Sequence, residues 1–180
     1  MTVKEFHNLG DRGVFEGRRA KLIHGVIVEE GMMSPAHATA IVLVTEALRA
    51  TFRNGWRFCI QLPLVFGPTT DPVPDVAVVR GSVRGTSVHP TTAELVVEVA
   101  DSSLNYDTTV KAELYATAGI PDYWVIDVEN RQLHVFRDPV PLPEGLGTTA
   151  YRSHVTLAAT DSASPLAVPD RSIRVAEMLP

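Results

Sequence analysis

The sequence predicts a mixed β-sheet with helices packed on it, of the α/β (α+β) class. Three observations lead to this prediction. Short apolar runs of strand character recur along the chain, and two other segments repeat apolar residues at helical spacing. Residues 94–127 read as strand, helix and strand, a βαβ unit whose crossover is almost always right-handed if its strands are parallel.

Composition limits the classes of protein to which the chain could belong. Its 180 residues, 45% hydrophobic and 21% charged, are typical of one globular domain, which we expect over residues 1–180. Apolar runs fall short of the ~18 to 20 residues that cross a bilayer. The charged N-terminal segment lacks the apolar core of a signal peptide. The single cysteine, Cys59, agrees with a reducing compartment, so we expect a cytoplasmic protein without membrane contact.

The N-terminal third predicts a β-hairpin followed by a helix. Residues 20–30 read as two short strands that turn at His24 and Gly25. Ser34 is a good N-cap and Pro35 suits the first helical position, and apolar residues then recur at helical spacing to about residue 52.

The rest of the chain predicts the main sheet. Strands are expected over 56–66, 75–80, 94–100, 123–127, 132–137 and 151–158, with a loop over 81–92. A helix over 107–118 is indicated by apolar residues four apart and by Gly119 and Pro121, which end it. A short helix is expected near 175–179.

Two carboxylates stand out in the predicted strands. Asp75 begins one strand, and Glu98 is the only interior charge of the next, nearly all-apolar run. A carboxylate inside such a run loses hydration that a cation or a metal ion must replace. Mg²⁺ commonly binds one or two carboxylates together with water and substrate phosphate. The pair therefore predicts a metal site if the two strands are adjacent.

Lys111 is the expected cation of this site. It lies one turn into the predicted helix, four residues after Asp107. A helix that packs back on the sheet would bring its amine near Glu98, where it could orient a water or stabilise charge on a phosphoryl group. The alternative is a surface ion pair between Asp107 and Lys111, worth a few tenths of a kcal/mol.

Several stretches together carry a resemblance that covers most of the chain: residues 34–37, 61–64, 74–79, 95–102, 107–111, 114–116 and 119–127. They resemble the "putative restriction endonucleases" of the Uma-two type, a family of the PD-(D/E)xK nuclease superfamily. The resemblance implies an αβββαβ restriction-endonuclease-like core. It implies divalent-metal ligands at Asp75 and Glu98, and therefore Mg²⁺ or Mn²⁺ as cofactor and DNA as partner.

The sequence departs from that pattern at two positions. The third signature position, two residues after Glu98, is Ala100 rather than lysine, and the family's lysine matches Lys111 on the following helix. The family's early glutamate aligns with Lys21. These departures leave open that the chain is a catalytically degenerate member of that family.

Five further residues are expected around the site in supporting roles. His37 shares the buried face of its helix, so a core histidine and a functional one are both open. Gln61 and Tyr115 could line the same cleft, with packing or hydrogen bonding as the alternative. Asp71 could help a metal but also suits a turn. Asp107 could act with Lys111.

The leading hypothesis is a Mg²⁺-dependent endonuclease acting on DNA, with Asp75, Glu98 and Lys111 as its catalytic residues. The alternative is a binding or regulatory module on the nuclease fold. A glycosidase-like carboxylate pair is disfavoured because aromatic residues make up only 7% of the chain. The net charge of −5 requires any contact with DNA to be local. Because cutting a duplex needs two sites, we expect a homodimer through residues 62–66 or the hairpin at 123–137.

Overall fold

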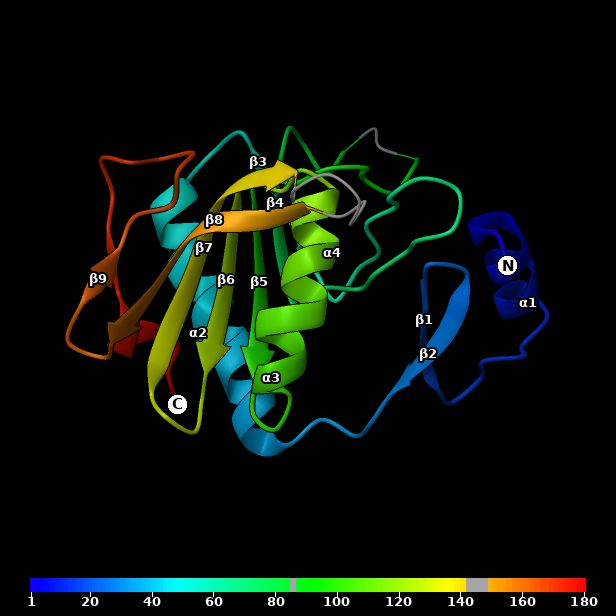
Figure 1. Cartoon of the computed structure of the whole chain (residues 1–180), viewed down its shortest axis with the longest axis horizontal. Helices are drawn as coiled ribbons and strands as arrows, with labels where there is room; N and C mark the ends of the chain where they lie inside the picture. Colours follow the sequence, from blue (N-terminus) through cyan, green and yellow to red (C-terminus); the bar gives the residue numbers. More distant parts are fainter. Residues whose placement is uncertain (85–86, 142–148) are drawn as a thin grey trace.

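A six-stranded mixed sheet forms the centre of the molecule in the computed structural model, which describes residues 1–84, 87–141 and 149–180 (Figure 1). The strands follow the order β3-β4-β5-β6-β7-β8, in which β5 and β6 are parallel and every other neighbouring pair is antiparallel. Their bounds are β3 (Trp56–Ile60), β4 (Val76–Arg80), β5 (Leu95–Ala100), β6 (Asp122–Asp127), β7 (Gln132–Pro141) and β8 (Thr149–Ala158). The mixed α/β class and the parallel βαβ unit are confirmed.

Helical segments cover the two faces of the sheet (Figure 1). Helix α2 (Pro35–Phe52) packs on one face. The other carries α3 (Leu104–Tyr106), a π-helical turn (Asp107–Lys111) and α4 (Ala112–Thr117). Because successive strand residues point to opposite faces, β5 contributes Val97 and Val99 to the α2 side and Val96 and Ala100 to the α4 side. Glu98 therefore belongs to the α4 side.

Helix α2 begins where the sequence predicts. The Ser34 hydroxyl accepts a hydrogen bond from the His37 amide, and Pro35 occupies the first turn, where its missing N–H is no loss. This cap places His37 in the first turn of the helix, at the end of the sheet where Asp75 precedes β4.

The N-terminal region forms a unit beside the main sheet. Strands β1 (Arg19–Ile23) and β2 (Val26–Glu30) pair as the predicted hairpin. Helix α1 (Val3–Asp11) was not predicted, although Thr2 and Glu5 form a capping box at its start. Gly25 is required at the hairpin turn because its φ is 78° and a Cβ would lie 3.1 Å from the Met1 backbone. An isolated bridge between Leu22 and Asp71 connects the hairpin to the Pro-rich segment 68–74, which precedes β4.

One predicted strand is much shorter in the structure. The strand expected over 56–66 ends at Ile60, because Gln61 adopts a positive φ of 50° that breaks extended backbone. In the hairpin at 123–137, one of the two segments expected at a dimer interface, β6 is wholly buried between β5 and β7, whereas β7 and the turn are partly exposed. The loop predicted over 81–92 includes residues 85–86, which lie outside the described residues.

The C-terminal segment closes the α2 side of the core. It comprises β9 (Ser162–Ala163), β10 (Ile173–Arg174) and a 3₁₀ turn (Val175–Met178), which is the short helix predicted near 175–179. Val175 and Met178 are buried in the same cluster as α2. Across the described residues, no helix has the length and apolar character needed to span a membrane.

Candidate active site

The register of β4 against β5 brings the two singled-out carboxylates together. Val76 pairs with Val97, so the preceding residue, Asp75, stands opposite Glu98. Directly opposed side chains of an antiparallel pair lie on the same face with Cβ atoms about 5 Å apart. Asp75 Oδ2 is also fixed to β5, since it accepts a 2.9 Å hydrogen bond from the Val99 amide.

Glu98 is held at both carboxylate oxygens. The Tyr115 hydroxyl donates to Oε1 at 2.6 Å, and Lys111 Nζ lies 2.9 Å from Oε2. Both partners come from the helical segment that packs on this face, as the predicted βαβ unit requires. Glu98 is only 2% exposed, so these two contacts replace the hydration that burial removes.

The π-helical turn positions Lys111 between two carboxylates. Its Nζ lies 2.7 Å from Asp107 Oδ1 as well as near Glu98, so the pair with Asp107 is buried rather than a surface pair. The Ser103 hydroxyl donates to Asp107 Oδ2, and Tyr123 donates to the Asp107 carbonyl at 2.8 Å. π turns are rare and occur often at functional sites.

Asp75 Oδ1 is contacted by residues from the start of α2 and from just after β3. His37 Nε2 lies 3.2 Å away, and Gln61 Nε2 donates at 3.3 Å. The Gln61 amide also donates to the Asp75 carbonyl at 3.0 Å, which offsets the strain of a non-glycine residue with positive φ. The start of α2 and the end of β3 thus converge on the first residue before β4.

These contacts shift the ionisation of the buried groups. Burial raises the pKa of Glu98 to about 7, and attraction to Lys111 only partly opposes it. Burial by itself lowers the pKa of Lys111, but its two carboxylate partners raise it above its ordinary value. For Asp75, burial would raise the pKa, but the hydrogen bond and charge of His37 hold it below its usual range. Near neutral pH Lys111 therefore stays charged while Glu98 can exchange a proton.

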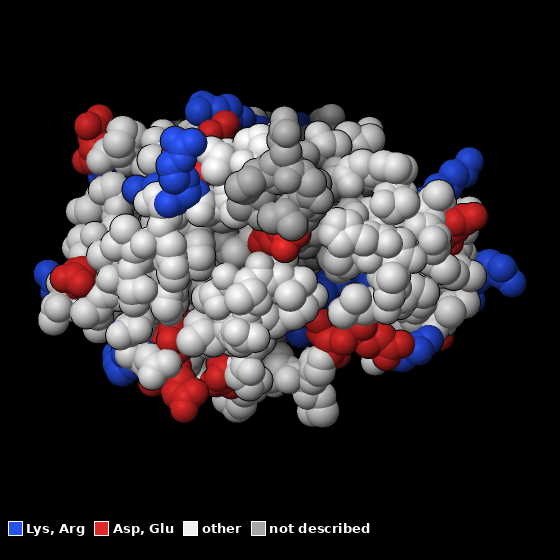
Figure 2. Space-filling model, viewed as in Figure 1, with Lys and Arg blue, Asp and Glu red and all other residues white. Residues whose placement is uncertain are grey.

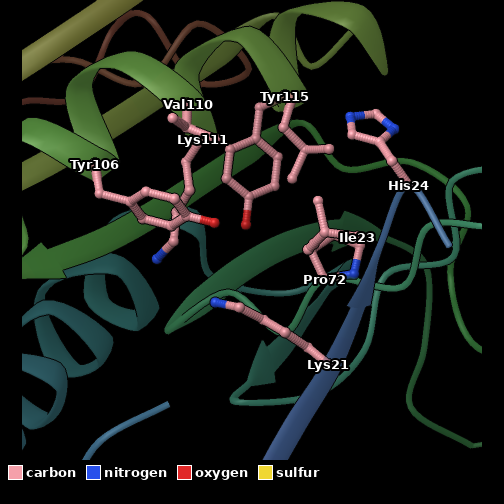
Figure 3. Close-up of a pocket in the computed structure, with 9 residues that line it drawn as sticks. Lys21, Ile23, His24, Pro72, Tyr106, Val110, Lys111 and Tyr115 are labelled. Carbon is pink, nitrogen blue, oxygen red and sulfur yellow. The ribbon is translucent and has the colours of Figure 1, made fainter. Parts of the chain in front are cut away.

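The cluster opens into a cleft between the hairpin and the main sheet. The cleft has a volume of about 280 Å³ and is lined by His37, Asp75, Glu98 and Lys111 together with Arg19, Lys21 and Glu30 of the hairpin. A smaller pocket of about 20 Å³ shares Lys21, Tyr106 and Lys111 with it. Figure 3 shows the amine of Lys21 and the hydroxyls of Tyr106 and Tyr115 turned toward the middle of this smaller pocket, whereas the amine of Lys111 lies at its edge.

Comparison with protein families gives a match over nearly the whole chain. The model of Uma2, described as "Putative restriction endonuclease", matches residues 3–176. The chain belongs to the Uma2 family. A search of curated proteins gives no match.

A solved structure has the same fold as this Uma2 chain. It is a crystal structure described as a putative nuclease belonging to DUF820 from Anabaena variabilis. The two share a TM-score of 0.75 at 15% identity, over 99% of this chain and 97% of that one. The likeness at this identity concerns the fold alone.

The structure brings most of the predicted Uma2 site residues together. Two sets of hydrogen bonds and ion pairs lie opposite each other in the register of β4 and β5. His37 and Gln61 contact Asp75 in one set, and Tyr115, Lys111 and Asp107 surround Glu98 in the other. Ala100 is buried in the α4-side core, and Lys111 reaches Glu98 from the helical segment instead. Asp71 lies elsewhere: its Oδ2 is 2.6 Å from His7 Nε2, and it lines a different cavity together with His7 and His89.

Sequence reasoning missed the charged hairpin residues of the cleft, among them Arg19 and Glu30. Lys21 had been noted only as a departure from the Uma2 pattern. In the structure its Nζ lies 2.5 Å from Glu30 Oε1, and Glu30 Oε2 lies 3.0 Å from the Arg19 guanidinium. The alternating charges of the hairpin carried a signal, since residues 19, 21 and 30 share one face of two paired strands.

The donor atoms of the site suit a hard divalent cation. Among the described residues, no group of three or more His, Cys, Asp or Glu side chains is arranged to hold a metal ion. Mg²⁺, however, commonly uses one or two carboxylates and takes its remaining ligands from water and substrate phosphate. Asp75 and Glu98, opposed across neighbouring strands beside an open cleft, fit that smaller set.

Proposed function

We propose that this chain is a Mg²⁺- or Mn²⁺-dependent endonuclease that hydrolyses phosphodiester bonds of DNA in the cytoplasm. One observation carries the proposal: two carboxylates oppose each other on β4 and β5, beside a charged lysine and an open cleft, in a Uma2 chain. A chain with a net charge of −5 does not attract DNA through its overall charge, so contact with DNA must be local. The cleft supplies a place for that contact.

In this proposal Asp75 and Glu98 hold the ion, and Lys111 is the catalytic cation. The bound ion would lower the pKa of a water molecule and polarise the scissile phosphate. Lys111 keeps its charge between Glu98 and Asp107, so it can orient that water or stabilise charge on the phosphoryl oxygens. Tyr115 fixes the orientation of Glu98, and His37 and Gln61 fix Asp75.

The test is cleavage of plasmid, single-stranded and structured DNA by the purified protein with Mg²⁺ or Mn²⁺. Parent protein should cut, and Asp75→Ala and Glu98→Ala should each lose at least about 100-fold in rate, since metal catalysis contributes several kcal/mol. Cleavage that survives both substitutions would refute the assignment. Arg80→Ala, which breaks an exposed pair with Glu94, is the control and should cut as the parent does.

A binding or regulatory module on the nuclease fold is the second candidate. It is favoured by the arrangement at Glu98, both of whose oxygens already have protein partners, and by Lys21, a cation on the hairpin strand that faces the cleft. Calorimetric titration separates the two: an absence of Mn²⁺ binding to the parent favours the module, whereas binding lost in Asp75→Ala favours the nuclease.

The proposal includes a homodimer, because a duplex has two strands to cut. Of the two segments considered, residues 62–66 keep some exposed apolar surface, with Leu62 44% exposed. Light scattering at tens of micromolar should give twice the chain mass of 19.6 kDa, and a monomer would contradict it.

A further inference from the structure

The hairpin holds two cations on a single carboxylate. Arg19 and Lys21 lie two residues apart on β1, so their side chains leave the same face of the strand about 7 Å apart. Glu30 on β2 pairs with both, through Oε2 to Arg19 at 3.0 Å and through Oε1 to Lys21 at 2.5 Å. The three side chains therefore carry one positive charge in excess.

This surplus charge faces the candidate active site. All three side chains line the cleft that also contains Asp75 and Glu98. Glu29, another acid of the cleft wall, is paired with Arg18 at 2.7 Å, so it does not offset the surplus. Figure 2 shows acidic side chains gathered at the lower right of the molecule, over the hairpin in this view, with basic side chains recessed beside them.

Lys21 is unusual for a hairpin lysine because its side chain is only 5% exposed. An ammonium group has three donor hydrogens. Within the described part of the chain, the hydrogen bond of Lys21 is to Glu30. Its amine is directed into the pocket that Lys111 also lines (Figure 3).

We propose that Arg19 and Lys21 form a phosphate-binding subsite for the DNA strand, beside the carboxylates that hold the metal. The proposal rests on the proposed function and extends it to the recognition of the substrate. Glu30 occupies both cations in the free protein, and a backbone phosphate of the strand replaces it. Arg19 offers a planar fork to phosphate oxygens and Lys21 a point charge, the two donor types that phosphate sites use.

The test measures binding of a fluorescent DNA duplex by anisotropy in EDTA, where no cleavage occurs, as a function of salt. Lys21→Gln and Arg19→Gln should each weaken binding by about tenfold and lower the slope of log K against log salt by about one. Glu30→Gln should instead tighten binding several-fold, because it frees both cations. Arg152→Gln, which removes the cation of an exposed pair with Asp138 outside the cleft lining, is the control and should bind as the parent does.

Because Lys21 is buried, thermal melting checks that the Lys21→Gln variant folds. The Lys21→Arg variant, which keeps the charge, should bind DNA as the parent does. The subsite is overturned if the parent does not bind DNA, if the Lys21→Gln and Arg19→Gln variants bind as the parent does, or if Glu30→Gln weakens binding. Cleavage is assayed separately with Mn²⁺. A parent that binds through the hairpin but never cuts would refute the endonuclease and keep the subsite. If Lys21→Gln and Arg19→Gln leave both cleavage and DNA binding unchanged, the subsite is refuted and the endonuclease is kept.

Discussion

Two charge clusters face the same cleft with opposite composition. The acidic cluster comprises Asp75, Glu98, Asp107 and Lys111, that is, three carboxylates and one ammonium. The hairpin cluster comprises Arg19, Lys21 and Glu30, two cations around one carboxylate. The first is suited to attract a metal cation and the second to attract an anion such as phosphate. In the proposed function, substrate and metal would meet between the two clusters.

The clusters also differ in how they are supported. The acidic cluster stands on central strands and a packed helical segment, and Asp107 and Glu98 are almost wholly buried. In the hairpin cluster, the side chains of Arg19 and Glu30 are 39% and 25% exposed, on a two-stranded sheet outside the main one. Charges at the first place depend on one another for stability, whereas at the second solvent screens Arg19 and Glu30 but not Lys21, which is 5% exposed.

The largest expected effect is the loss of folding stability when Lys111 loses its charge, and Lys21 provides the comparison. Lys111→Met should cost about 3 to 5 kcal/mol of unfolding free energy, because it leaves Glu98 and Asp107 buried without their cation. Lys21→Met should cost less than about 1 kcal/mol, because Glu30 keeps Arg19 and contact with solvent. Urea unfolding at pH 8 without metal measures both. Equal losses would end the distinction between the two clusters.

The second prediction concerns the pH dependence that Glu98 gives to stability. Its pKa is about 7 in the folded state against an ordinary value of 4.5, so between these values the folded state binds more protons than the unfolded state. The stabilising contribution is complete below about pH 4.5 and is lost as the pH rises through 7, by up to about 3 kcal/mol. Glu98→Gln removes this loss, and Lys111 keeps Asp107 as its partner. Without metal at pH 8, the variant should therefore be as stable as the parent or more so.

The measurement is unfolding of parent and Glu98→Gln at pH 5, 6.5 and 8, with and without millimolar Mn²⁺. The variant should lose most of the stabilisation that Mn²⁺ gives the parent. A large drop in melting temperature without metal, accompanied by an intact Mn²⁺ shift, would make Glu98 a structural carboxylate and remove the main support for the nuclease mechanism.

The acidic cluster could be foreseen from sequence because its signals are local. Asp75 begins a strand and Glu98 interrupts an apolar one, and both positions are visible without tertiary information. The helical position of Lys111, four residues after Asp107, is equally visible. Their convergence then follows from the parallel βαβ unit, which brings the helical segment back over β5. Ser34 and Pro35 likewise set the start of α2 through local capping.

The hairpin cluster could not be foreseen in the same way. The strands of the hairpin are readable, but nothing in their sequence says which part of the main sheet they face. That placement depends on the bridge between Leu22 and Asp71 and on the packing of α1, both of which are tertiary. The end of β3 at Ile60 was missed for a similar reason, since the contacts of Gln61 with Asp75 stabilise a positive φ.

A smaller effect is expected from the hydroxyl that holds Glu98. Tyr115→Phe leaves Glu98 Oε1 buried without its donor, so the unfolding free energy should fall by about 1 to 2 kcal/mol at pH 8. The Mn²⁺-induced shift in melting temperature should also change, because Glu98 loses its fixed orientation. Tyr151→Phe is the matched control: its hydroxyl donates to the Ile120 carbonyl, so it should lose stability without altering the Mn²⁺ shift.

The smallest effect is expected at Asp71, a buried carboxylate that lies outside both clusters. Asp71→Asn keeps the volume and a carbonyl that accepts from His7, so it should cost only about 1 kcal/mol. The loss should be local to α1, where hydrogen exchange of the helix amides should speed up. Calorimetric binding of Mn²⁺ should be unchanged, because Asp71 lines a different cavity from Asp75 and Glu98. If the substitution instead abolishes Mn²⁺ binding, the acidic cluster is incomplete as defined. The metal then draws a ligand from the segment between β3 and β4, which the Leu22–Asp71 bridge connects to the hairpin.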